Sequence, residues 1–157
     1  MPKFIADSML GKLSKWLRII GYDTLYFRKI EPKSIAKISN SEKRIILTRN
    51  SHLSELRPYK LVYINSTNID EQLKQIISEF KIDTKSRLFS ICTLCNTKVK
   101  RIKKEEAKDK VPSCVFKNNS SFYICQKCQK IYWQGSHYHN SISKINKLII
   151  FAYKDSI

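Results

Sequence analysis

The stretch FIADSMLGKLSKWLRIIGYDT, residues 4 to 24, decides how the N-terminal part of the chain folds. Its first three residues form a short apolar run typical of a buried strand, and apolar residues then recur at helical spacing from Leu10 to Ile20. Asp7 lies between the two patterns, and Gly21 ends the second. In an open α/β sheet, a polar side chain at the carboxyl end of a strand lies in the crevice where ligands bind. Asp7 is therefore either a site residue or a cap of the following helix, and the local sequence leaves both open.

Strand and helix patterns alternate along the next sixty residues. Apolar runs at residues 24–27, 45–47 and 61–64 predict three further strands, and the clearest helical pattern follows at residues 69–80. Alternation with short connections predicts the α/β class, with a parallel sheet covered by helices on both faces. The regular spacing of apolar residues weakens between residues 81 and 90, and cysteine, lysine and aromatic residues dominate afterwards. We therefore place one domain at residues 1–85 and a second at residues 91–157.

The chain of 157 residues is strongly basic, with 30 Lys and Arg against 13 Asp and Glu and a formal net charge of +17. Both parts share the excess, because residues 1–90 hold 17 basic and 9 acidic residues and residues 91–157 hold 13 and 4. Such a field attracts nucleic acid or another polyanion. No stretch approaches the roughly 18 to 20 apolar residues of a membrane span, and no signal sequence precedes the first strand. We expect a cytoplasmic or nuclear protein with no membrane partner.

Four of the five cysteines form two CxxC pairs, Cys92 with Cys95 and Cys125 with Cys128, separated by 29 residues. Two such knuckles can close a tetrahedral thiolate site for zinc around the hairpin of a zinc ribbon. Because a filled tetrahedron leaves no open position for substrate, we predict a structural zinc. The fifth cysteine, Cys114, precedes an apolar pair that resembles a strand, and we expect a buried or incidental thiol there.

Four stretches together resemble the Mut7-C RNase family, in which a PIN-like domain precedes a zinc ribbon. They are FIADSMLGKLSKWLRIIGYDT at 4–24, RIILTRN at 44–50, CTLC at 92–95 and CQKCQKIYWQGSH at 125–137. The resemblance implies a PIN-like parallel sheet of four or five strands, followed by a small C-terminal zinc ribbon. It also implies descent from ribonucleases that hold Mg²⁺ or Mn²⁺ between carboxylates at the strand ends.

The same resemblance makes Asp7 the first acid of such a site, with Glu31 and Asn50 as the other catalytic candidates. Members of the family usually carry Thr-Arg-Asp after the third strand, whereas this chain has Thr48, Arg49 and Asn50. The acidic segment after the second strand is reduced to Glu31. Fewer carboxylates weaken the attraction for a divalent cation and strengthen it for phosphate. We therefore predict a site that holds RNA more readily than it cuts RNA.

The predicted RNA contacts combine basic and aromatic side chains. Lys12, Lys15 and Arg18 recur every three residues and either form a basic ridge on the first helix or a solvated helix face. In the ribbon, basic side chains that neutralise phosphates accompany aromatic rings that can stack on unpaired bases. The complete set of predicted contacts is Lys12, Lys15, Arg18, Arg49, Lys98, Lys100, Arg101, Lys103, Lys104, Tyr132 and His137. We expect Trp133 to pack in the ribbon's own core.

Two functions fit these patterns. The first is an RNA-binding protein with a PIN-like, catalytically weakened nuclease domain, part of a ribonucleoprotein such as the ribosome, with ribosomal RNA and ribosomal proteins as partners. The alternative is an active endoribonuclease that uses Mg²⁺ or Mn²⁺ at Asp7, Glu31 and Asn50. Zinc is the expected structural cofactor in both cases.

Overall fold

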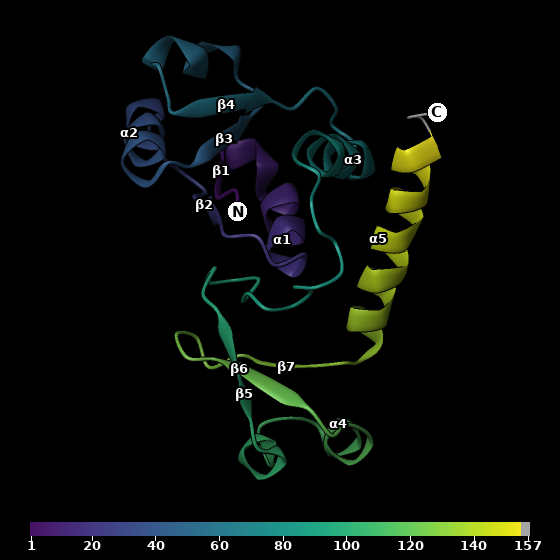
Figure 1. The fold of residues 1–157 in the computed structure, drawn as a ribbon. Helices are drawn as coiled ribbons and strands as arrows, with labels where there is room; N and C mark the ends of the chain where they lie inside the picture. The colour runs from purple at the N-terminus through teal and green to yellow at the C-terminus, as the bar shows by residue number, and fades with distance from the viewer. Residues whose placement is uncertain (155–157) are drawn as a thin grey trace.

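Two separate sheets organise the chain, one in each predicted domain (Figure 1). The computed structural model describes residues 1–154, and side chains through residue 150. The last three residues of the predicted second domain, 155–157, lie outside the described residues.

The N-terminal sheet has four parallel strands in the order β2-β1-β3-β4. Their bounds are β1 (Phe4–Ala6), β2 (Thr24–Tyr26), β3 (Ile45–Thr48) and β4 (Lys60–Tyr63). The helices that connect and follow them are η1 (Ser8–Leu10), α1 (Gly11–Ile19), α2 (Pro32–Glu42), η2 (Ser51–Leu56) and α3 (Ile69–Phe80). The predicted α/β class is confirmed, and each of these strands begins and ends within one residue of its expected bounds.

Helices cover both faces of this sheet (Figure 1). Successive side chains of a strand point to opposite faces, and all three residues of β1 are fully buried. Phe4 and Ala6 pack against α1, α3 and the C-terminal helix α5 (Ser136–Lys154), whereas Ile5 packs against α2 and η2. The sheet is thus the middle layer of three.

The strand order reverses between β1 and β3, because β2 lies on one side of β1 and β3 lies on the other. The carboxyl ends of two such strands border one crevice, the usual ligand position in open α/β sheets. Asp7 directly follows β1, and Arg49 directly follows β3. The backbone N–H of Asp7 donates to the carbonyl of Leu47 over 3.0 Å, so the two strand ends are held side by side.

The C-terminal sheet is an antiparallel ribbon of β5 (Val99–Ile102), β6 (Phe122–Cys125) and β7 (Ile131–Trp133), in that order. Two short helices, η3 (Lys104–Ala107) and α4 (Ser113–Asn118), close its far end. Ala107, Phe122 and Ile131 form its small buried core, and Trp133 packs against this core half-buried, as expected.

The predicted strand beside Cys114 is wrong. Of the two alternatives for its thiol, buried or incidental, the buried one is also wrong. Residues 113 to 118 form α4, which begins directly after Pro112. Val115 on this helix packs on the ribbon core, and this orientation leaves Cys114 exposed.

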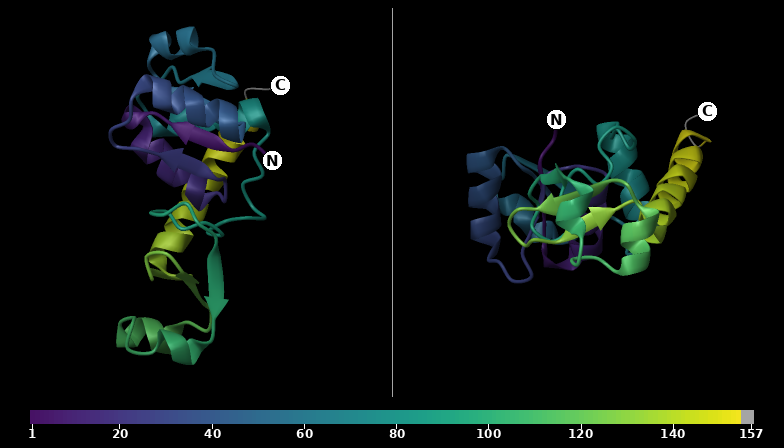
Figure 2. Two further views of the ribbon diagram at one scale, coloured as in Figure 1. Left: turned by 90° about the vertical axis from the view of Figure 1, so that its left-hand side faces the viewer. Right: turned by 90° about the horizontal axis from the view of Figure 1, so that it is seen from below.

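Helix α5 returns from the ribbon to the first domain and lies beside α3 (Figures 1 and 2). Ile145 and Leu148 join the core that contains β1, and Lys144 forms an ion pair of 2.5 Å with Asp70 at the start of α3. The segment from residue 91 onward therefore contains a ribbon and a helix that belongs to the packing of the first domain. Within residues 1–154, no helix combines the length and the apolar composition needed to cross a membrane.

Candidate functional site

Asp7 accepts three hydrogen bonds from its own surroundings. Its Oδ1 accepts from the backbone N–H of Met9 over 2.8 Å, which caps the short helix η1. Its Oδ2 accepts from the hydroxyl of Thr48 over 2.5 Å and from the backbone N–H of Arg49 over 3.0 Å. A carboxylate offers about four acceptor sites. The capping role of Asp7 is thus confirmed. Its role as a site residue stays a prediction, which its place at the ligand-binding edge typical of open α/β sheets favours.

The other two catalytic candidates lie at the starts of helices. Asn50 is exposed, and its side-chain oxygen caps η2 by accepting from the backbone N–H of His52 over 3.0 Å. Glu31 is exposed at the N-terminal end of α2. Arg49, the residue before Asn50, is half-buried, and its Nε has no hydrogen-bond partner in the part of the chain that is described.

This edge of the sheet fits a Mg²⁺ or Mn²⁺ site poorly. Such ions prefer several oxygen ligands, usually including carboxylates. In residues 1–150, whose side chains are described, the cysteines are the one group of three or more His, Cys, Asp or Glu whose ligand atoms converge. Among these residues, Asp7 is thus not part of a converging group of three or more such side chains, which is the kind of group that a site with one or two divalent cations commonly uses.

The four predicted metal ligands Cys92, Cys95, Cys125 and Cys128 do converge, with all four sulfur atoms within 4.8 Å of one another. The Sγ atoms of Cys92 and Cys128 are 3.7 Å apart. A tetrahedron with metal–sulfur bonds of about 2.3 Å has edges of about 3.8 Å. The donor set and its spacing therefore fit a tetrahedral metal ion of zinc's size.

Each knuckle turns through a residue with left-handed backbone directly after its second cysteine. Asn96 has φ 59° and Gln129 has φ 62°, and each donates its backbone N–H to the carbonyl of the first cysteine, over 3.0 Å for Asn96 and 2.8 Å for Gln129. Asparagine adopts this conformation more easily than most residues with side chains. The repeated turn directs both sulfur atoms of each pair toward the same point.

Neighbouring hydroxyl groups also contact the sulfur atoms. The hydroxyl of Tyr132 donates to Sγ of Cys92 over 3.1 Å, and Thr97 contacts Sγ of Cys125 at 3.2 Å. Burial acts to raise the pKa of Cys125, but hydrogen bonds from Thr97 and from backbone N–H groups lower this pKa to about 6. Hydrogen bonding with Cys128, followed by burial, raises the pKa of Cys95 to about 12. The close sulfur atoms therefore cannot all carry a negative charge easily by themselves, and a divalent cation would stabilise four thiolates at this spacing.

Arg18 does not lie on the predicted basic ridge. Its side chain is 7% exposed, and its Nε donates to the carbonyl of Thr24 in β2 over 2.9 Å. Its Nη1 donates to the carbonyls of Thr93 and Leu94, inside the first knuckle, over 2.9 and 3.0 Å. Burial lowers the pKa of Arg18, and the negative charge of the adjacent cysteine thiolates opposes this shift. Arg18 therefore joins the first domain to the cysteine cluster, and the ridge retains Lys12 and Lys15.

A second set of contacts joins the same two parts. The side-chain oxygen of Asn96 accepts from the backbone N–H of Thr24 over 2.8 Å, and its amide donates to Asp23 over 2.6 Å. Asp23 also accepts two hydrogen bonds from the buried guanidinium of Arg44, over 2.7 and 3.0 Å. The first knuckle is thus docked on α1 and β2 through polar contacts that the sequence did not reveal.

A groove of about 770 Å³ lies between α1 and the ribbon. It brings together four of the predicted RNA contacts, namely Lys12, Lys15, Tyr132 and His137. Lys12, Lys15 and His137 are exposed, and Tyr132 is half-buried. These residues come from α1, β7 and α5, so only the folded chain assembles them.

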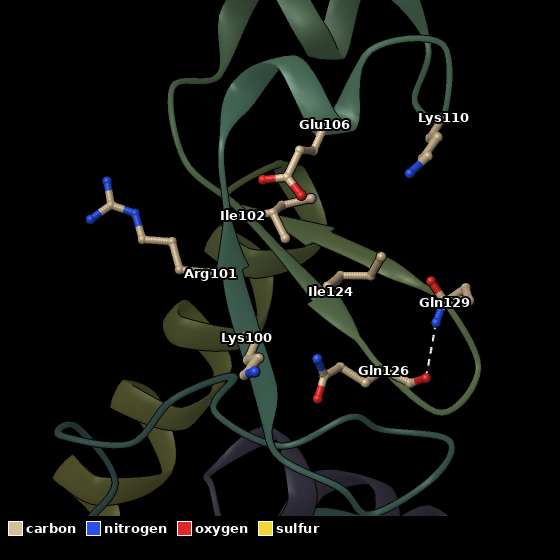
Figure 3. Close-up of a pocket in the computed structure, with 8 residues that line it drawn as sticks. All are labelled: Lys100, Arg101, Ile102, Glu106, Lys110, Ile124, Gln126 and Gln129. Atoms are coloured by element: carbon tan, nitrogen blue, oxygen red, sulfur yellow. Dashed lines mark hydrogen bonds between the residues drawn. The ribbon is translucent and has the colours of Figure 1, made fainter.

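The remaining ribbon candidates lie outside this groove. Lys100 and Arg101 border a separate polar pocket of about 500 Å³ on the ribbon (Figure 3). Glu106 and Lys110 lie on one side of this pocket and Gln126 and Gln129 on the other, whereas Arg101 extends away from the other labelled side chains (Figure 3). Lys98 and Lys103 flank β5 in the sequence, and Lys104 begins η3, where its Nζ lies 5.0 Å from the ring centroid of Phe116.

Several groove residues were missed by the sequence reasoning. Trp16, Phe89, Lys130 and Tyr138 all line the groove, although no pattern in the sequence singled them out. Trp16 follows Lys15 directly on the first helix, and its position off the leucine stripe was an available signal. Phe89 and Tyr138, whose ring centroids are 4.7 Å apart, meet only through the packing of α5.

Comparison with protein families gives one result. A model described as the Mut7-C RNAse domain matches residues 2–145, which includes both sheets and the first half of α5. Comparisons with curated proteins and with solved structures give no match.

Proposed function

The chain belongs to the Mut7-C RNase family, and on this basis we propose that it binds RNA through a nuclease-type fold that no longer cuts RNA efficiently. The observation that carries the proposal is the state of Asp7. Its carboxylate accepts hydrogen bonds from Met9, Thr48 and Arg49, and within residues 1–150 it belongs to no converging group of three or more potential metal ligands. The net charge of +17 supports a polyanionic partner.

Zinc is our proposal for the metal at the four cysteines. It is commonly bound by four thiolates in structural sites, and the spacing of the sulfur atoms suits its bond length. A metal here would stabilise the ribbon, whose buried core is small. We further propose that the protein acts in the cytoplasm within a ribonucleoprotein such as the ribosome, in contact with ribosomal RNA and ribosomal proteins.

Binding and cleavage can be separated with one preparation of the full, zinc-loaded chain. We expect a labelled single-stranded RNA to bind with an affinity that falls steeply as salt is added, because phosphate contacts release counterions. We expect the wild-type chain with Mg²⁺ or Mn²⁺ to cleave the same RNA no faster than an Asp7→Asn variant does, so that both show only the background rate of cleavage. An affinity that does not respond to salt would contradict RNA binding through phosphates.

The alternative, an active endoribonuclease, is favoured by the place of Asp7 at the point where the strand order reverses. Its signature would be cleavage that needs Mg²⁺ or Mn²⁺ and disappears in a folded Asp7→Asn variant. The ribosomal proposal has its own test, which is co-sedimentation with ribosomal subunits that resists added salt. Migration with free protein alone would contradict that proposal.

A further inference from the structure

The groove between α1 and the ribbon has the charge expected of a surface for a polyanion. Its lining includes Lys12, Lys15 and Lys130, all exposed, and His137. No Asp or Glu is among its lining residues in the described part of the chain. Since the chain contains 13 acidic residues, their exclusion from this groove makes its potential more positive than a mixed surface would be.

The same groove is rich in aromatic rings that are only half-buried. These rings belong to Trp16, Phe89, Tyr132, Trp133 and Tyr138. The hydroxyl of Tyr132 is fixed by its bond to Cys92, and Nζ of Lys130 lies 5.5 Å from the centroid of the Tyr132 ring. The Tyr132 ring is therefore already ordered in the folded chain and need not be ordered when a ligand binds.

We propose that this groove binds one or two unpaired nucleotides of single-stranded RNA, with bases on its aromatic rings and phosphates on Lys12 and Lys15. This inference rests on the proposed function and identifies the groove as the site of RNA binding. A double helix hides its base faces, so stacking on side chains requires unpaired bases. The volume of about 770 Å³ lies within the range of about 300–1,000 Å³ common for small-ligand pockets. The rest of a longer strand would lie outside the groove.

The chain offers a direct readout, because both of its tryptophans, Trp16 and Trp133, line the groove. We expect a short oligouridine to quench their fluorescence as it binds the zinc-loaded protein. A preformed RNA duplex and a chain of inorganic polyphosphate should bind through charge with little quenching. If anisotropy shows that the oligonucleotide binds but tryptophan fluorescence is unchanged, the proposal that RNA binds in this groove is wrong, whereas the proposal that the protein binds RNA stands. No binding by either measurement would overturn the proposed function as well.

Charge variants test the lysines with a matched control. The double variant Lys12→Gln and Lys15→Gln should reduce the slope of log affinity against log salt by about 1.4, at about 0.7 for each lost phosphate contact on a single strand. The control changes Lys33 and Lys37 to Gln; both are exposed on α2, which covers the opposite face of the sheet. An equal change in both double variants would overturn the proposed site.

Aromatic variants test the stacking. Tyr138→Ala should weaken binding roughly 5- to 150-fold if its ring stacks on a base. Tyr59→Ala is the control, because Tyr59 is 54% exposed and does not line the groove. Equal affinities of the two variants, with unchanged thermal unfolding, would overturn stacking at Tyr138.

Discussion

Replacing Arg18 with methionine should loosen the junction between the first domain and the metal cluster. The guanidinium is 7% exposed and donates three hydrogen bonds, one to β2 and two to carbonyls of the first knuckle. A hydrogen bond to a charged group contributes about 1.5–3 kcal/mol net. Two of the three share the same nitrogen, so two independent bonds are a fair count. Methionine also removes the free-energy penalty of burying a charge. The expected loss of unfolding free energy is therefore near the lower limit for two such hydrogen bonds, at roughly 3–4 kcal/mol.

The assay is urea unfolding of the full, zinc-loaded chain, together with the rate at which a chelator removes the metal. A loss of this size is a large part of the roughly 5–15 kcal/mol by which small domains are stable. Faster metal release is expected as well, because Arg18 holds the backbone of the first knuckle at Thr93 and Leu94. The control is Lys15→Met on the exposed side of the same helix, where surface changes usually stay within about 0.5 kcal/mol.

Arg18→Lys keeps the positive charge but not the planar fork that reaches two elements at once. We expect this variant to recover only part of the stability. The reasoning would be refuted if Arg18→Met unfolded within about 1 kcal/mol of the wild type. It would equally be refuted if the metal left both proteins at the same rate.

Three further outcomes follow from particular residues. Metal analysis should find about one zinc per chain; Cys92→Ser should lower both zinc content and stability, whereas Cys114→Ser, at an exposed thiol outside the cluster, should change neither. Burial acts to raise the pKa of Asp23, but hydrogen bonds from its arginine and asparagine partners outweigh burial and lower this pKa. The contribution of Asp23 to the stability of the fold should therefore be complete above about pH 4 and be lost as the pH falls further. Asp23→Asn should remove this part of the pH dependence of stability in urea titrations. Gly21→Ala should cost roughly 2–4 kcal/mol by thermal unfolding, because φ is +92° there and an added Cβ would overlap the carbonyl oxygen of Arg87; unchanged unfolding would contradict this close approach.

Local patterns were sufficient for the elements of the first domain. Buried parallel strands are continuous apolar runs, and helix α3 has a regular apolar stripe that begins after Asn68, whose side chain caps its first turn. The cysteine cluster was equally predictable, since four thiols at CxxC spacing have few other arrangements. Residues close together in the sequence determine these features, so local sequence patterns are enough to predict them.

Contacts between distant segments were beyond the same reasoning. Arg18 follows the spacing of two exposed lysines, yet the knuckle that buries it lies about 75 residues further along the chain. For α5, a signal was present, because Ile142, Ile145 and Ile149 recur at helical spacing, but this pattern could not tell which surface the helix covers. From the sequence we predicted Lys12, Lys15, Tyr132 and His137 of the groove as RNA contacts. The other lysine and aromatic residues of the groove, and the fact that α1 and the ribbon face one another, were not predicted.

The first helix connects the three functional features of the molecule. Just before it, Asp7 ties the ends of β1 and β3 together, at the edge of the sheet where we predicted a catalytic site. In the middle, Lys12, Lys15 and Trp16 face the groove. At its last turn, Arg18 fixes the first knuckle, and Tyr132 connects that knuckle to the opposite wall of the groove. Because Arg18 of α1 and Tyr132 of β7 both contact the first knuckle, we expect loss of a metal from the four cysteines to disturb both walls of the groove and so to weaken the RNA binding that we propose there.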